Sequence, residues 1–285
     1  MRSLLFVPAD NERKLAKAES CGADALVFDL EDSVLPERKP AARRMLAEYL
    51  SSYRGSSQVW IRINDLTSGE LLKDLAAAVP MGPLGIMQPK IRGPEDLEIV
   101  SHYLDMAEVQ AGREAGSMGM LAVCTETPSA VLRMGELIGH RLPRLKGMLW
   151  GGEDLSSAIG AGDPRAPDGS WRPVYEYART QCLLACHALE VEALDTVYVD
   201  FRDPDGCRRN SEAARYDGFT GKVAIHPDQV AVINAAFTPS DDEIAQARRV
   251  IAAFASGAGA VSLDGKMLDI PHLKGARRLL ASVGA

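Results

Sequence analysis

Ser3-Leu4-Leu5-Phe6-Val7 and Ala25-Leu26-Val27-Phe28-Asp29-Leu30 are two short apolar runs at the start of this chain, and residues 11–20 between them read as a helix. An apolar run of this length suits a strand that is buried on both faces. Two such strands joined by a helix form a β–α–β unit, in which the strands run parallel. The opening of the chain therefore predicts an α/β protein with a parallel sheet.

The same unit recurs along the chain. Six further apolar runs lie at residues 59–63, 84–87, 120–124, 147–150, 196–199 and 223–225. Helical stretches follow the second to eighth runs, at residues 39–53, 70–79, 94–110, 129–137, 175–189, 211–216 and 228–235. Eight β–α repeats predict a closed (β/α)₈ TIM barrel. A doubly wound open sheet is the alternative architecture.

The predicted barrel occupies residues 1–238, and residues 239–285 form a short C-terminal helical extension, or lid. Residues 240–255 are strongly helical, and a Gly/Ala-rich connection leads from them to residues 261–285. This last segment is too short to bury a core of its own. We expect it to pack on the barrel or on a neighbouring subunit.

The composition limits the possible functions. The chain has 285 residues, of which 46% are hydrophobic and 25% charged, which is typical of a globular protein with a large core. A net charge of −7 argues against a nucleic-acid-binding surface. No apolar run approaches the ~20 residues that span a bilayer, and the first run is too short for a signal peptide. We therefore expect a cytoplasmic protein with no membrane partner.

Several catalytic motifs are missing from the sequence. It has no G-x-S-x-G, no G-x-x-x-x-G-K-[ST], no G-x-G-x-x-G after the first strand and no H-E-x-x-H. None of the five cysteines forms a CxxC pair, although Cys182, Cys186 and His187 lie close together on a predicted helix. Reduced core thiols are the favoured interpretation of these cysteines, with a metal site as the alternative.

Charged residues gather where the predicted strands end. Active sites of TIM barrels lie at this rim, and charges so close together are costly unless they pair or hold a metal. The rim residues are Asp29, Glu31, Asp32, Arg62, Lys90, Glu126 and Asp154.

Two of these carboxylates suggest a metal site. Glu126 and Asp154 follow adjacent strands, and Mg²⁺ takes a few protein oxygens while leaving positions for water and substrate. Gly152, next to Glu153, permits close approach of a substrate to the backbone, where free N–H groups bind a carboxylate. As the alternative, Glu126 and Asp154 only cap helices.

The other rim residues have both structural and functional interpretations. Asp29, Glu31 and Asp32 either act in the site or only cap a helix and pair with Arg62 and Lys90. Arg62 within an apolar strand needs a carboxylate or an anion. Lys90 at a strand end is an alternative Schiff-base residue. His226 before Pro227 is expected to have a structural side chain.

At this point the sequence resembles the citrate lyase β-subunit (CitE-like) family within the HpcH/HpaI aldolases. The resemblance covers nearly the whole chain, and the order and spacing of its motifs are specific. It begins with Arg2-Ser3-Leu4-Leu5-Phe6-Val7-Pro8, Gly22-Ala23-Asp24 and Asp29-Leu30-Glu31-Asp32. It continues through Arg62-Ile63-Asn64, Pro89-Lys90, Glu126-Thr127, Gly151-Gly152-Glu153-Asp154-Leu155, Asp200-Phe201-Arg202-Asp203, Ile225-His226-Pro227 and Gly265-Lys266-Met267-Leu268-Asp269.

The resemblance implies a Mg²⁺-dependent lyase, with Mn²⁺ able to substitute, that makes or breaks a carbon–carbon bond in a 3-hydroxyacyl thioester such as citryl-, citramalyl- or malyl-CoA. By resemblance, Glu126 and Asp154 bind the metal, Arg62 faces the thioester, and the backbone at Gly152, Glu153 and Asp154 takes the keto-acid carboxylate.

The resemblance also assigns residues outside the metal pair. Asp269 is the implied acid/base, often supplied by a neighbouring subunit of a homo-oligomer, a trimer or hexamer. The residues implied to contact CoA are Phe6, Arg13, Lys17, Ile225 and His226. Phe6 is sometimes tyrosine in the family, and the basic residues near Arg13 vary.

Two other functions stay open. A malyl-CoA-type thioesterase would use the same metal and arginine, and a non-catalytic CoA-binding or assembly protein would keep the scaffold. The sequence identifies neither the acyl chain, nor whether CoA or an acyl carrier bears it, nor whether citrate lyase α and γ subunits are partners.

Overall fold

A computed structural model of the chain describes residues 1–167 and 169–283. Eight parallel strands pair in chain order, and β8 pairs with β1 to close the barrel. They are β1 (Ser3–Pro8), β2 (Ala25–Asp29), β3 (Gln58–Arg62), β4 (Gly85–Gln88), β5 (Gly119–Val123), β6 (Leu145–Leu149), β7 (Glu192–Asp195) and β8 (Gly221–Ala224). The predicted (β/α)₈ barrel is confirmed, and the open-sheet alternative is wrong.

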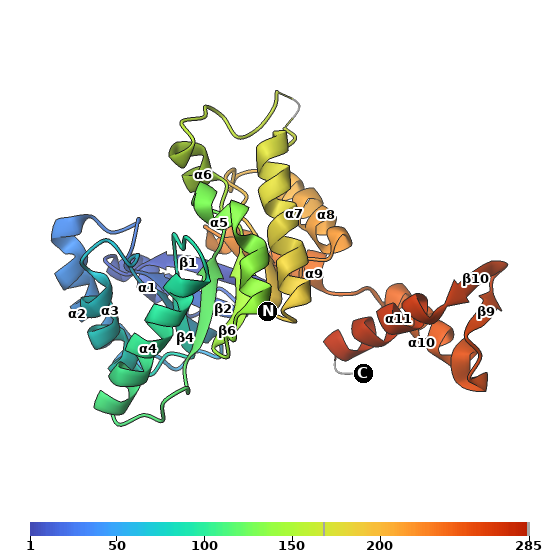
Figure 1. Ribbon diagram of the computed structural model, residues 1–285, viewed down its shortest axis with the longest axis horizontal. Helices are drawn as coiled ribbons and strands as arrows, with labels where there is room; N and C mark the ends of the chain where they lie inside the picture. Colours follow the sequence, from blue (N-terminus) through green and yellow to red (C-terminus); the bar gives the residue numbers. More distant parts are fainter. Residues whose placement is uncertain (168, 284–285) are drawn as a thin grey trace. The chain divides into compact units, whose positions relative to one another are not determined.

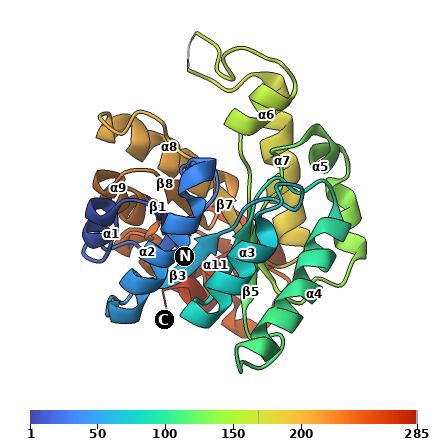
Figure 2. The same ribbon diagram turned by 90° about the vertical axis from the view of Figure 1, so that its left-hand side faces the viewer.

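Helices surround the strands on the outside of the barrel (Figure 2). They are α1 (Glu12–Ala18), α2 (Lys39–Ser52), α3 (Leu71–Ala78), α4 (Pro94–Gln110), α5 (Pro128–Leu132), α6 (Glu153–Ala158), α7 (Pro173–Ala188), α8 (Pro204–Asp217) and α9 (Pro227–Phe237). No helix among the described residues is both long and apolar enough to cross a bilayer.

The barrel interior holds alternate side chains from the strands. Leu4, Val27, Trp60 and Leu194 belong to one buried cluster there. The indole of Trp60 fits because two neighbouring strands carry glycine. A Cβ on Gly85 would lie 2.4 Å from the Trp60 ring and 2.2 Å from the carbonyl oxygen of Gly119. Since side chains alternate along a strand, residues two positions after Val27 and Trp60 also face inward.

Three sequence predictions need correction. The seventh strand was predicted at residues 196–199, but β7 is Glu192–Asp195. Leu194 pairs with both β6 and β8. The Thr196 carbonyl accepts a hydrogen bond from the Lys222 side chain instead of continuing the strand pairing. Helix α8 starts at Pro204 rather than residue 211, since Asp203 caps it. The helix predicted at residues 129–137 is α5 followed by a 3₁₀ turn, Met134–Gly139.

A second compact unit comprises Ala235–Ala285, and the first comprises Met1–Asn234. The second unit contains α10 (Asp241–Ala253), β9 (Ala260–Leu263), β10 (Lys266–Asp269) and α11 (Ile270–Ser282), coloured orange to red in Figure 1. Its own cluster includes Val250, Phe254 and Leu273. The extension predicted as helical thus also holds a hairpin, because Asp264 and Gly265 both adopt positive φ, as a tight two-residue turn requires.

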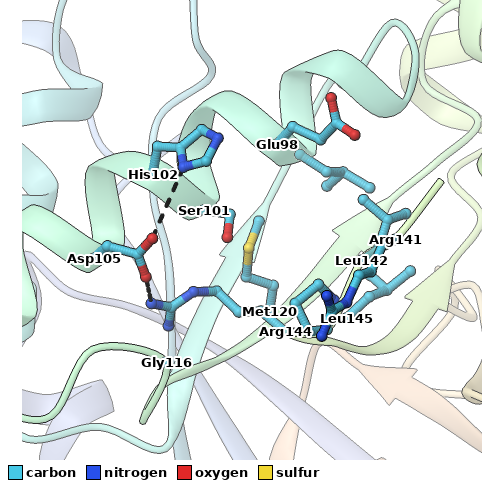
Figure 3. Close-up of a pocket in the computed structure, with 12 residues that line it drawn as sticks. Glu98, Ser101, His102, Asp105, Gly116, Met120, Arg141, Leu142, Arg144 and Leu145 are labelled. Atoms are coloured by element: carbon cyan, nitrogen blue, oxygen red, sulfur yellow. Dashed lines mark hydrogen bonds and ion pairs between the residues drawn. The ribbon is translucent and has the colours of Figure 1, made fainter.

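A cavity of about 410 Å³ lies beside α4, at the end of the barrel where β5 and β6 begin (Figure 3). Arg144 at its edge pairs with Asp105 and with buried Glu108, whose Oε2 is 2.6 Å from Arg144 Nη2. The backbone N–H groups of Met118 and Gly116 also donate to Glu108, at 2.6 and 2.8 Å. Burial alone would raise the pKa of Glu108, but these donors lower it from 4.5 to about 2.

We expect Glu108→Gln to cost about 3 kcal/mol of unfolding free energy at pH 7, because a depressed pKa stabilises the fold while the carboxylate is ionised. That difference from the wild type is present above about pH 4.5 and is lost as pH falls through about 2. Urea unfolding of both proteins between pH 7 and 3 measures it. Glu136→Gln, which breaks an exposed pair with Arg133, is the control and should change stability little. A Glu108→Gln penalty that does not shrink with falling pH would contradict the assignment.

Candidate active site

Strand register brings Arg62 beside Asp29. The two residues are direct partners between β2 and β3, at the carboxyl ends of the strands, and both face the barrel interior. Arg62 Nε and Nη2 each donate to an Asp29 oxygen at 2.7 Å, and Nη1 lies 3.1 Å from Glu31 Oε2. The guanidinium also lies over the Phe6 ring, 4.5 Å from its centroid. Although burial opposes it, the pKa of Arg62 is raised by these carboxylates, so Arg62 is a permanent, fixed cation.

Lys90 links the acidic loop after β2 to the metal-ligand candidates. Its ammonium contacts Glu31, lies 2.6 Å from Asp32 Oδ2 and lies 3.5 Å from Asp154 Oδ1. Its backbone N–H donates to Glu126 Oε2 at 2.6 Å, in a conformation with φ of 51°. One interpretation of Asp29, Glu31 and Asp32 was that they pair with Arg62 and Lys90. The contacts in the structure agree with that interpretation.

The same contacts bear on Schiff-base chemistry at Lys90. Burial alone would lower the pKa of Lys90, but Asp32 and Glu31 raise it above its ordinary value. A Schiff base needs a neutral amine. The surroundings of Lys90 therefore disfavour that alternative.

Glu126 and Asp154 line one cavity of about 370 Å³. The alternative that they are simple helix caps does not describe the structure: Thr127 caps α5 through its hydroxyl, and Gly152 occupies the N-cap position of α6. Glu126 is only 5% exposed, and burial together with the charge of Asp154 raises its pKa to about 8. Two carboxylates held so close favour a shared cation.

The donor set for such a cation is small. Among residues 1–167 and 169–283, no group of three or more His, Cys, Asp or Glu side chains is arranged to hold a metal ion. Glu126 and Asp154 are two of the carboxylates that line the rim cavity, and a site with only two carboxylate ligands leaves other positions to water and ligand. Mg²⁺ is commonly bound in this way, through one or two carboxylates.

A larger cavity of about 980 Å³ lies beside the Arg62 pair. It is lined by the predicted residues Phe6, Lys17, Ile225 and His226, together with Asp29 and Arg62. Gln229 Oε1 accepts the backbone N–H groups of Ile225 and His226, at 2.9 and 3.2 Å, and so fixes their turn. The cavity has the volume of a small-molecule pocket.

The lining of this cavity differs from the prediction at two positions. Arg13 is exposed and is not among its lining residues, whereas Lys14 is. Phe201, which no prediction singled out, stacks on the His226 ring with centroids 4.7 Å apart. The predicted structural role of the His226 side chain agrees with this stacking and with its contact to the Asp228 N–H.

Asp269 belongs to the second unit, where it ends β10 and caps α11. Its Oδ1 lies 2.5 Å from His272 Nδ1, and half of its side chain is exposed. Its carboxylate is therefore available to a ligand without the loss of any core contact.

A parallel eight-stranded barrel with carboxylates, a fixed arginine and two cavities at the carboxyl ends of its strands is the architecture of a TIM-barrel enzyme. The sequence profile of the HpcH/HpaI aldolase/citrate lyase family matches residues 2–227, and that of a carbon–carbon bond lyase of the TIM-barrel fold matches residues 172–283. The chain belongs to the HpcH/HpaI aldolase/citrate lyase family, a family of carbon–carbon lyases, as the resemblance predicted.

Relatives with known names agree with this membership. The chain is 34% identical over 300 residues to the mitochondrial citramalyl-CoA lyase of Rattus norvegicus, covering 98% of this chain and 85% of that protein. It is 35% identical to the (3S)-malyl-CoA thioesterase of Cereibacter sphaeroides, covering 100% and 95%. A solved structure of CitE from Mycobacterium tuberculosis in complex with magnesium, acetoacetate and coenzyme A has a TM-score of 0.81 and 31% identity, covering 100% and 98%.

Proposed function

We propose that this protein is a Mg²⁺-dependent lyase that cleaves, or forms, the carbon–carbon bond of a 3-hydroxyacyl-CoA of the citramalyl-, malyl- or citryl-CoA type. The products of cleavage would be an acyl-CoA such as acetyl-CoA and a keto acid. The single observation that carries the proposal is the rim geometry, in which the Glu126–Asp154 pair neighbours the fixed cation Arg62. The CitE relative with magnesium, acetoacetate and coenzyme A supports the choice of ligands.

In this proposal Glu126 and Asp154 hold the metal, for which Mn²⁺ can substitute. When bound, the metal supplies Lewis-acid polarisation of the hydroxyl and carboxylate oxygens. The backbone at Gly152, Glu153 and Asp154 would bind the keto-acid carboxylate. Gly152 immediately precedes Glu153, which begins α6.

Arg62 would stabilise the enolate of the departing thioester. As the bond breaks, negative charge develops on the thioester oxygen, and a fixed cation in a water-poor site stabilises it. Asp29 pairs with Nε and Nη2 of Arg62 and Glu31 lies beside Nη1, so the orientation of the guanidinium does not have to be established during the reaction. Glu31, Asp32 and Lys90 would orient the residues that contact substrate and metal, without contacting either ligand themselves.

Asp269 would serve as the acid/base. In cleavage it would remove the hydroxyl proton as the carbon–carbon bond breaks, and protonation of the enolate carbon would then give the acyl-CoA; in condensation it would return a proton to the new hydroxyl. We propose that it acts from a neighbouring copy of the chain in a homo-oligomer, a trimer or hexamer. We also propose that the functional boundary between the barrel and this unit lies after residue 238.

The large cavity would take the CoA portion. Phe6, Ile225 and His226 supply apolar and aromatic surface, and Lys17 and Lys14 supply positive charge for phosphates. Arg13, one helical residue away from this lining, would act at longer range.

The proposal is tested by assaying purified protein with Mg²⁺ on citryl-, malyl- and citramalyl-CoA, with both fragments identified by mass spectrometry. We expect an acyl-CoA and a keto acid from at least one thioester, and none after removal of the metal with EDTA. Free CoA together with the intact hydroxy acid would instead establish a thioesterase, as in the Cereibacter sphaeroides relative. CoA binding without turnover would establish a non-catalytic protein.

A further inference from the structure

Gly152 is packed between two indole rings. A Cβ on Gly152 would lie 3.2 Å from Trp171 Cζ3 and 3.3 Å from Trp150 Cζ3. The two rings also contact each other, with centroids 4.8 Å apart in an edge-to-face arrangement. The backbone at Gly152 therefore cannot move toward either ring, and the turn that leads into Glu153 and Asp154 starts from a fixed point.

Trp150 is held in turn by a buried charge. Its Nε1–H donates to Asp195 Oδ1 at 2.7 Å, and both residues are almost completely buried. The other Asp195 oxygen, Oδ2, accepts from Lys222 Nζ at 2.6 Å. The same ammonium donates to the Thr196 carbonyl at 2.6 Å. Asp195 at the end of β7 and Lys222 of β8 thus determine the orientation of the Trp150 indole, which follows β6.

Burial makes this arrangement rigid. Lys222 is fully enclosed, and Arg179 of α7 adds a second positive charge, with its Nε 3.5 Å from Asp195 Oδ1. An ion pair enclosed in this way is weak evidence for stability, because desolvation offsets much of the attraction. Its directional hydrogen bonds do, however, restrict the ring of Trp150 to one orientation.

We propose that Asp195, Trp150 and Trp171 are positioning residues that fix the Gly152–Asp154 turn for binding of the metal and the keto acid. The inference rests on the proposed function of that turn. None of the three is among the described residues that line the two rim cavities. They therefore act through the backbone of the turn and not by touching the ligand.

Trp171→Phe is the most direct test. Phenylalanine keeps an aromatic ring at the position but lacks the outer benzo atoms, Cζ3 and Cη2, that occupy the space where a Gly152 side chain would lie. We expect the affinity for pyruvate, the keto acid that citramalyl-CoA would release, to fall about 10-fold or more in the presence of Mg²⁺, as is usual when a supporting contact of a metal site is lost. CoA affinity should stay unchanged, because the large cavity has other lining residues. Calorimetric titration measures both affinities without turnover.

Trp60→Phe is the matched control. Trp60 lies in the barrel interior, against Gly85 and Gly119, and does not contact Gly152. The Trp60→Phe substitution removes an indole from the same barrel and should leave the affinity for pyruvate at the wild-type value. Thermal melting establishes that each variant is folded at the temperature of the titration. Asp195→Asn, which keeps an oxygen for Trp150 but loses the charge facing Lys222, should weaken pyruvate binding in the same way if it folds.

The outcomes separate the inference from the proposed function. If the wild type binds Mg²⁺ with pyruvate and Trp171→Phe binds it equally well, the positioning role is wrong and the proposed function stands. If Trp171→Phe weakens CoA and pyruvate binding alike, the residue is merely structural and the positioning role is again wrong. If the wild type binds none of the three keto acids that the proposed substrates would release (pyruvate, glyoxylate or oxaloacetate) with Mg²⁺, the proposed function fails and this inference fails with it.

Discussion

Asp154→Asn is expected to lower turnover by about 10³-fold and to abolish measurable Mg²⁺ binding, since a metal at this position contributes several kcal/mol to transition-state stabilisation. Asp154 supplies one of the two carboxylates of the proposed donor set, and an amide oxygen without charge is a poor substitute. The fold should be little affected. A third of the Asp154 side chain is exposed, and its ion pair with Lys90 is long, at 3.5 Å.

The measurement is metal affinity by calorimetry together with the rate of thioester cleavage at saturating Mg²⁺. Asp65→Asn is the matched control, because Asp65 lines the same cavity and its loss changes the local charge equally. Its bonds to Thr67 can be kept by the amide oxygen. Equal losses in both variants would mean that overall charge, and not ligation by Asp154, determines the activity. An Asp154→Asn protein with wild-type turnover would exclude the metal pair.

The barrel could be predicted from the sequence because most of its strands contain an apolar run. Strands buried on both faces leave that pattern in the sequence, and the helices between them leave another. The rim could be predicted for a related reason. A charged residue next to an apolar run must lie at a strand end or have a buried partner. Arg62 and Asp29 lie at strand ends and are also each other's partners in a largely buried ion pair.

The position of β7 could not be predicted in the same way. Glu192-Ala193-Leu194-Asp195 carries a charge at each end, whereas Thr196-Val197-Tyr198-Val199 is richer in residues that favour strands. The ladder forms at the first segment because Asp195 has a buried partner, Lys222, from the neighbouring strand. That partner is 27 residues away in the sequence, and periodicity does not reveal pairs at such a separation.

The packing of tryptophans on Gly152 was missed for a similar reason. Trp150 ends an apolar run and Trp171 lies in a separate loop, and neither position indicates a contact with Gly152. The contact of Trp171 with this turn depends on the path that the chain takes after α6, for which the sequence shows no periodic pattern. The short helix α6 was not among the predicted helical stretches, although the helix-cap alternative for Asp154 implied a helix there. A signal was present, since Gly152 precedes two acidic residues in the first turn of α6, where the helix dipole favours negative charge.

Asp269→Asn is expected to reduce turnover by about 10²–10⁴-fold, the range that a positioned general acid or base contributes. Asparagine keeps the size of the side chain and can still cap α11, because its oxygen accepts the same backbone N–H. The contact with His272 can also be retained. The variant thus separates proton transfer from helix capping. Its Mg²⁺ and CoA affinities should match the wild type, since the donors to both ligands lie in the barrel.

Asp269→Ser is the companion variant, because serine caps helices as well as aspartate does but carries no ionisable carboxylate. If Asp269 acts as acid/base, both variants fold, bind both ligands and lose turnover to a similar extent. If Asp269 only caps the helix, both keep a wild-type rate, and the acid/base must then be sought within the barrel. Mixing Asp269→Asn protein with Asp154→Asn protein tests where the proton donor resides. Recovery of activity in mixed oligomers, in which an intact Asp269 meets an intact metal pair from another copy, is expected only if the carboxylate acts between subunits.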